Sequence, residues 1–110
     1  MSYLHGDSVV ERWRRMTLVE QIGNIGSEIS RTASAQNKDE SRFNNAIERA
    51  LELFDLTLSD PRWRGRLLEI GRMREVFCDT ILGGAEYGDN LTDLQKYFDQ
   101  FAYVANNRKV

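Results

Sequence analysis

The sequence predicts an all-α protein folded as an antiparallel up-down-up-down four-helix bundle. Apolar residues recur at three- and four-residue steps in four long segments, the period of helices with one buried face. Short polar stretches separate these segments, which favours antiparallel neighbours. The chain has one proline and lacks alternating β-branched runs, so strands are not expected. The four helices are expected at about residues 8–35, 38–58, 61–82 and 91–106 of one domain that spans residues 1–110.

The first segment contains two capping boxes, one from Ser8 to Glu11 and one from Thr17 to Glu20. Either a single helix runs through both, or a short extra N-terminal helix ends near Met16 and a second helix starts at Thr17. The repeated start signal favours a break. Beyond it, a regular apolar stripe predicts the buried face: Leu18, Ile22, Ile25, Ile29 and Ala33.

A row of small residues runs beside that stripe. It includes Gly23 and Gly26, although a glycine inside a helix costs about 1 kcal/mol relative to alanine. Two glycines in four residues therefore indicate that something approaches closely. It is either a neighbouring helix of the same chain or a subunit partner or ligand. The other members of the row are Ser27, Ser30 and Ser34.

The second and third helices form the central pair. Asn37 with Glu40 marks the start of the second, and the joint at Asp60 and Pro61 separates the two. Asp60 can cap the third helix, and Pro61 fits its first position because the missing N–H is not needed there. The second helix is expected to bury Phe43, Ile47, Ala50, Leu51, Phe54 and Leu58, with Leu53 and Leu56 outside this stripe.

The third helix carries Arg74 on its apolar stripe, which otherwise consists of Trp63, Leu67, Ile70, Phe77 and Ile81. A buried guanidinium must be paired, because it cannot lose its charge. Three interpretations stay open. Arg74 lies at the edge of the stripe with its head in water, it binds a ligand, or it forms a buried ion pair with one of four acids. These are Glu28, Glu48, Glu52 and Asp55.

Gly83 and Gly84 end the third helix, and a loop over residues 83–90 leads to the last one. Asp89 or Asn90 is expected to cap that helix. Its predicted stripe is Leu91, Leu94, Phe98, Phe101 and Ala105.

The charge pattern points weakly to an anionic partner. The net charge is only −2, so no overall field attracts nucleic acid or an anionic membrane. The chain has twelve arginines and only three lysines, however, and the planar guanidinium of arginine binds phosphate and carboxylate groups better than the lysine ammonium does. Trp13 and Trp63 lie within two arginine clusters, and the Trp–Arg combination is enriched in interface hot spots. The clusters contain Arg12, Arg14 and Arg15, and Arg62, Arg64 and Arg66.

Catalytic and metal-binding motifs are not found. His5 is the only histidine, so a bundle di-metal site with Glu-x-x-His pairs is excluded, and neither metal nor cofactor is expected. The single cysteine, Cys78, cannot form an internal disulfide, which fits a reducing compartment. No apolar run reaches membrane-spanning length, and the N-terminal residues show no short apolar core followed by a small-residue cleavage site, so a cytoplasmic protein without membrane contact is expected.

Three stretches, IGNIGSEISRT, ERALELFDLTLSDPRWRGRL and REVFCDTILGGAEYG, resemble a family of small uncharacterised prokaryotic helical proteins over residues 12–105. That resemblance implies no activity. In size and helix pattern the chain more loosely resembles the S23-type four-helix-bundle proteins. This group includes ring-forming, nucleic-acid-binding accessory subunits of diversity-generating reverse transcriptases, but those subunits are strongly basic.

The sequence thus predicts a non-catalytic helical interaction module that self-associates or docks on a protein partner. The first alternative is a nucleic-acid-binding accessory protein that uses the two arginine clusters with Trp13 and Trp63. The second is an enzyme with a site around Arg74 and the helix acids.

Overall fold

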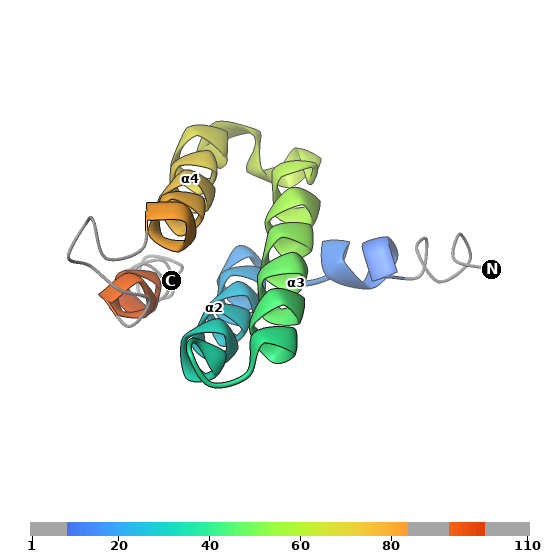
Figure 1. Cartoon of the computed structure of the whole chain (residues 1–110). Coiled ribbons are helices and arrows are strands. Elements are labelled where there is room, and N and C mark those ends of the chain that lie inside the picture. Colours follow the sequence, from blue (N-terminus) through green and yellow to red (C-terminus); the bar gives the residue numbers. More distant parts are fainter. Residues whose placement is uncertain (1–8, 84–92, 101–110) are drawn as a thin grey trace.

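A computed structural model of the chain describes residues 9–83 and 93–100. Every regular element in this part is a helix, and no strand occurs there. The elements are a short helix at residues 9–14, α2 (Leu18–Ala35), α3 (Glu40–Leu58), the 3-10 helix η1 (Pro61–Arg66), α4 (Leu67–Gly83) and a helical segment at 93–100. Figure 1 shows α2 and α3 side by side, with η1 and α4 following at the far end of α3.

The first helical segment is interrupted between residues 14 and 18, where the second capping box predicts a start. The Thr17 hydroxyl accepts a hydrogen bond from the Glu20 amide at 3.1 Å, and the Glu20 carboxylate accepts one from the Thr17 amide at 2.8 Å. Because these bonds satisfy free donors of the first turn, α2 begins independently of the 9–14 helix.

Asn37 ends α2 rather than starting α3. Its φ of 64° lies in the left-handed region, and the amides of Lys38 and Asp39 both donate to the Ala35 carbonyl at 3.0 Å. Asparagine tolerates this conformation better than most residues, so it suits a helix C-terminus. The cap of α3 is Asp39, whose carboxylate accepts from the Arg42 amide at 3.1 Å. The expectation of Asn37 as the cap was therefore wrong by two residues.

The core forms around Phe54 of α3. Its ring lies 6.0 Å from that of Phe77 on α4 and 5.8 Å from that of Phe98 in the 93–100 helix. The α2 stripe supplies Ile22, Ile25 and Ile29, all fully buried. The buried residues of the 9–14 helix, α2, α3, α4 and the 93–100 helix therefore form a single apolar cluster.

The buried faces of α3 and α4 are rotated from the expected ones. On α3, Leu53 is buried, whereas Phe43, Ile47, Leu51 and Leu58 are half-buried at the edge. The buried positions of α3 are Ala46, Ala50, Leu53, Phe54 and Thr57. On α4 the core residue between Ile70 and Phe77 is Met73, and Leu67 is exposed. Packing on two sides of α3 selects these faces, which the spacing of large residues alone does not reveal.

Residues 9–83 and 93–100 thus form an all-helical structure, with five α-helices that pack together; the antiparallel four-helix order stays a prediction. The third helix also starts differently from the prediction. Asp60 caps it and Pro61 is in its first turn, but residues 61–66 are 3-10 helix and Trp63 has non-helical angles (φ −102°, ψ 24°). Most of the 83–90 loop, most of the C-terminal half of the 91–106 helix, His5 and Ser8 lie outside the described residues.

No helix in the described residues is both long and apolar enough to cross a membrane.

Candidate functional site

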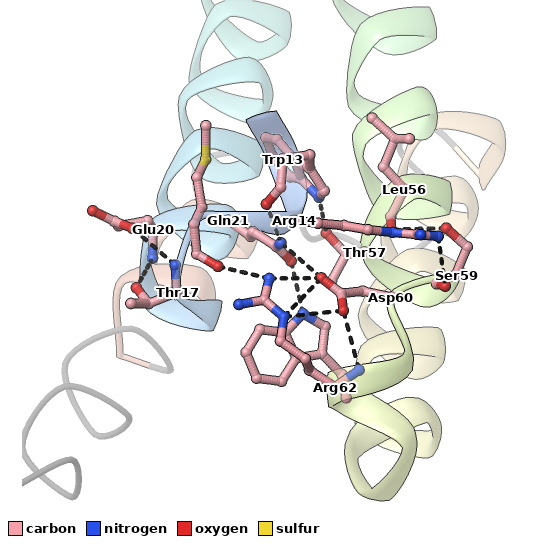
Figure 2. Close-up of polar contacts among 12 residues, drawn as sticks. Trp13, Arg14, Thr17, Glu20, Gln21, Leu56, Thr57, Ser59, Asp60 and Arg62 are labelled. Atoms are coloured by element: carbon pink, nitrogen blue, oxygen red, sulfur yellow. Dashed lines mark hydrogen bonds and ion pairs between the residues drawn. The ribbon is translucent and has the colours of Figure 1, made fainter. Parts of the chain in front are cut away.

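The two tryptophan–arginine segments meet beside the start of α2 and the end of α3, and Figure 2 shows the contacts between them. Arg14 donates from Nη2 to the Ser59 carbonyl at 3.3 Å, and Arg62 donates from Nη2 to the Met16 carbonyl at 2.8 Å. Residues more than 40 positions apart in the sequence are therefore joined directly. The geometric condition for a shared basic surface, that both clusters lie at one end, is met.

Between these segments lies a polar network formed by Trp13, Gln21, Thr57, Asp60, Arg62 and Trp63. At its centre is Gln21, which is fully buried. Its Nε2 donates to the Trp13 carbonyl at 2.7 Å and to Asp60 Oδ2 at 3.3 Å, while its Oε1 accepts from Trp63 Nε1 at 2.9 Å. An indole nitrogen can only donate, so this contact fixes which amide atom of Gln21 faces Trp63.

Trp13 belongs to the core rather than to a surface. Its side chain is 5% exposed, and its Nε1 donates to Thr57 Oγ1 at 3.0 Å. Thr57 is itself fully buried, near the C-terminal end of α3. A partner cannot reach Trp13 in this fold, so Trp13 no longer supports the hypothesis of a tryptophan hot spot.

Asp60 is a buried carboxylate with one dominant partner. It is 2% exposed, and Arg62 donates to it from Nη2 at 2.7 Å, from Nε at 3.1 Å and from the backbone amide at 3.1 Å. The Arg62 side chain, with help from the Arg62 amide and Gln21, holds the pKa of Asp60 below its usual value against the opposing effect of burial. The carboxylate raises the pKa of Arg62 in turn, so both groups stay charged.

The local sequence explains this arrangement. A residue before proline favours extended angles, which Asp60 adopts (φ −79°, ψ 115°), and this turns its carboxylate back over the first amides of η1. The Arg62 guanidinium then lies over the Trp63 ring, 4.4 Å from its centre. Because its guanidinium is already bound by this cation–π contact and the ion pair, Arg62 is not free to bind an outside anion.

The other arginines of the two clusters differ in their availability. Arg66 pairs with Glu69 at 2.9 Å, and Arg14 bonds the Ser59 carbonyl. Three are exposed and make no side-chain bond to any residue in the described ranges: Arg12, Arg15 and Arg64. Only these three retain a full guanidinium for an outside anion.

Arg74 does not lie in a buried polar site. Its Nε donates to Asp55 Oδ1 at 3.0 Å, but the side chains are 35% and 63% exposed. The other three acids do not join this pair, since Glu28 bonds Arg31 at 2.7 Å, Glu52 lies 3.9 Å from Arg49, and Glu48 is exposed. The interpretation of Arg74 as a residue at the edge of the stripe fits best, with one exposed ion pair added.

Two surface features were missed from the sequence. The first is a face of α4 that carries exposed leucines, and the second is a hollow between α2 and α3 lined by cations. The signal for the first was available, because Leu68 and Leu82 fall opposite the buried stripe of α4 on a helical projection. The signal for Gln21 and Thr57 was weaker, since polar residues beside a core stripe usually lie at its edge.

Comparisons of the chain with protein-family models, with curated proteins and with solved structures find no match. The family resemblance stated above therefore stays a prediction.

Proposed function

We propose that the protein is a non-catalytic helical interaction module that pairs with a second copy of itself through the outer face of α4. We define this outer face by Leu68, Arg72, Glu75, Asp79 and Leu82. The observation that carries the proposal is the exposure of its two leucines, 82% for Leu68 and 84% for Leu82. Exposed apolar side chains on one helix face offer a partner surface whose removal from water is favourable.

The two leucines share one side of α4. They are separated by 14 positions, about four helical turns, which correspond to about 21 Å along the axis. The opposite side is the one that α4 buries, through Ile70, Met73 and Phe77. Val76 is 41% exposed and adds apolar surface beside this face. The leucines therefore lie at the two ends of a flat strip directed away from the core.

A second copy fits this strip because the charges between the leucines are complementary in the antiparallel direction. When Leu68 lies against Leu82 of a second copy, Arg72 lies against Asp79 of that copy, and the same two contacts recur by symmetry. Glu75 falls next to the two-fold axis, where it approaches its own copy. That like-charge contact weakens the pair and limits its affinity.

The expected affinity is modest. Burying an exposed leucine contributes about 1.5–3 kcal/mol, and four leucines are buried in the symmetric pair. Loss of rotational and translational freedom opposes this gain by several kcal/mol or more. One helix face also covers less than the about 1,200 Å² typical of stable complexes. We expect a dissociation constant between about micromolar and millimolar.

Sedimentation velocity over a wide concentration range tests the proposal. Leu68→Ser and Leu82→Ser should each shift the dimer to higher concentration by tenfold or more, because each substitution occurs twice in the pair. Glu75→Gln should shift it the other way by removing the like-charge contact. Val9→Ser is the matched control, since Val9 is an exposed apolar residue on another helix. A strict monomer at all concentrations, or a dimer indifferent to Leu68→Ser, would refute the proposal.

We also infer that α2, α3, α4 and the 93–100 helix are the members of the antiparallel four-helix bundle. The contacts of Phe54 with Phe77 and Phe98 support this arrangement. In such a bundle the outer face of α4 is open to a partner. A cytoplasmic location stays our expectation, based on the single cysteine.

Nucleic-acid binding is the second candidate, favoured by one observation: the two arginine clusters share one end, and Arg12, Arg15 and Arg64 are exposed there. Binding to random-sequence RNA should then fall steeply with salt, and changing all three arginines to glutamine should reduce the salt slope. Lys96→Gln, an exposed cation outside the two clusters and the outer face of α4, is the control. An absence of RNA binding at low salt would remove this candidate.

A further inference from the structure

A hollow of about 660 Å³ lies between the C-terminal half of α2 and the N-terminal half of α3. It exists because the facing residues are small: Ser30 and Ser34 on α2, and Ala46 on α3. Ala35 and Ala46 are buried and give it an apolar base. Its volume is within the range of about 300–1,000 Å³ that small-molecule sites occupy.

Cations predominate around this hollow. Four cationic side chains line it, together with the two carboxylates of Glu28 and Asp39. Both carboxylates are already engaged, since Glu28 accepts from Arg31 at 2.7 Å and Asp39 accepts from the Arg42 amide at 3.1 Å. The cations are Arg31, Lys38, Arg42 and Arg49.

Lys38 and Arg42 are the two cations of this lining whose side chains form no ion pair with a described residue. Neither side chain makes an ion pair or hydrogen bond within residues 9–83 and 93–100. Arg49 reaches Glu52 only at 3.9 Å, and both of these side chains are more than half exposed. In a chain whose net charge is −2, this hollow therefore has a local positive surplus.

Neutral hydrogen-bonding groups complete the lining. The side chains of Ser30, Ser34 and Asn45 border the hollow and make no hydrogen bond to other described residues. Hydroxyl and amide groups of this kind orient a ligand, while an arginine fork and a lysine point charge bind its anionic group. An apolar base between them suits a ligand with a neutral body.

We propose that this hollow binds a small phosphate ester of about mononucleotide size. Lys38 and Arg42 bind the phosphate, and the body of the ester lies over Ala35 and Ala46, within reach of Ser34. The site shares no residue with the outer face of α4, so it stands or falls separately from the proposed self-association.

An NMR titration of the full chain tests the site, with AMP, ribose 5-phosphate, adenosine and inorganic phosphate as probes. AMP or ribose 5-phosphate should give saturable shifts of the backbone amides of Ser34, Lys38 and Arg42. Adenosine should give none, because it lacks the anionic group. Inorganic phosphate should bind about tenfold more weakly than the better ester, because it has no body to cover the apolar base.

The double variant Lys38→Gln, Arg42→Gln should weaken ester binding at least about tenfold. Both positions are exposed, so the fold should be retained, which the unchanged amide spectrum of α4 would verify. Lys96→Gln is the matched control, an exposed cation outside both the hollow and the outer face of α4, and should bind as the parent does. The proposal is overturned if neither ester shifts these amides, if inorganic phosphate binds as tightly as both esters, or if the double variant binds unchanged.

Discussion

Replacing Gln21 by methionine tests whether the polar network holds the 9–14 helix and η1 onto the bundle. Methionine has a similar length and no hydrogen-bonding amide, so it keeps the volume of the fully buried side chain and removes its three bonds. The Trp13 carbonyl then loses its donor, and Trp63 Nε1 loses its acceptor. Asp60 keeps its bonds from Arg62.

The expected loss of stability follows from these orphaned groups. A buried polar group left without a partner costs about 1–3 kcal/mol. Trp63 is only half-buried, so its indole N–H can recover part of its cost from water, whereas the Trp13 carbonyl faces the buried amide it has lost. We expect Gln21→Met to lower the free energy of unfolding by about 2–4 kcal/mol, a large share of the about 5–15 kcal/mol of a typical domain.

Urea denaturation followed by circular dichroism at 222 nm measures this loss. Gln36→Met is the matched control, because the Gln36 side chain is half-buried at the end of α2 and makes no side-chain hydrogen bond to described residues. It should change stability by less than about 0.5 kcal/mol.

A double-mutant cycle with Trp63→Phe then isolates the bond between Gln21 and Trp63. Within this bond, each single substitution leaves one atom orphaned, either Trp63 Nε1 or Gln21 Oε1, and the double substitution leaves neither. The combined loss should therefore fall short of the sum of the two single losses by about 1 kcal/mol. A loss from Gln21→Met as small as that of the control, or strictly additive losses, would refute the stabilising role of the network.

Two further predictions concern one buried charge and two glycines. Because Arg62 lowers the pKa of Asp60, the stability that this carboxylate contributes is present at neutral pH and is lost as the pH falls through and below the ordinary value of 3.8. Asp60→Asn should therefore be less stable than the parent at pH 7, and the difference should shrink towards pH 3; parallel unfolding curves over this range would contradict it. Gly23→Ala should raise stability by about 1 kcal/mol, because an added Cβ meets no atom within 4 Å and alanine favours the helix. Gly26→Val should lower it, since a Cβ there already lies 3.9 Å from Phe98 Cβ, and thermal melts of both variants would show whether the two glycines differ in this way.

The sequence was most informative where structure depends on neighbouring residues. The Thr17 capping box and the Asp60–Pro61 joint were predicted correctly, because each involves bonds within three residues. The prediction of Asn37 as the cap of α3 was wrong, although this cap also involves only neighbouring residues. Asparagine suits both a helix start and a left-handed helix end, and only the Asp39 cap two residues later decides between them.

Side-chain burial was harder to predict, because it depends on which neighbours cover a helix. Spacing placed Arg74 on the core stripe, while Met73, one position earlier, fills that place in the fold. Of the candidate site, the two clusters could be located from the sequence, but not their division into structural and free residues. That division depends on bonds between residues about 40 positions apart, and no local pattern encodes them.

Both tryptophans of the chain belong to the polar network, so intrinsic tryptophan fluorescence reports on this one region of the protein. The emission maximum depends on the solvent exposure of the two indole rings. In the fold, Trp13 packs in the core and Trp63 lies beneath the Arg62 guanidinium. The turn between α2 and α3 contains no tryptophan, so its opening alone should leave the emission unchanged. A red shift that precedes the loss of helical signal would therefore identify detachment of the 9–14 helix as the first step of unfolding.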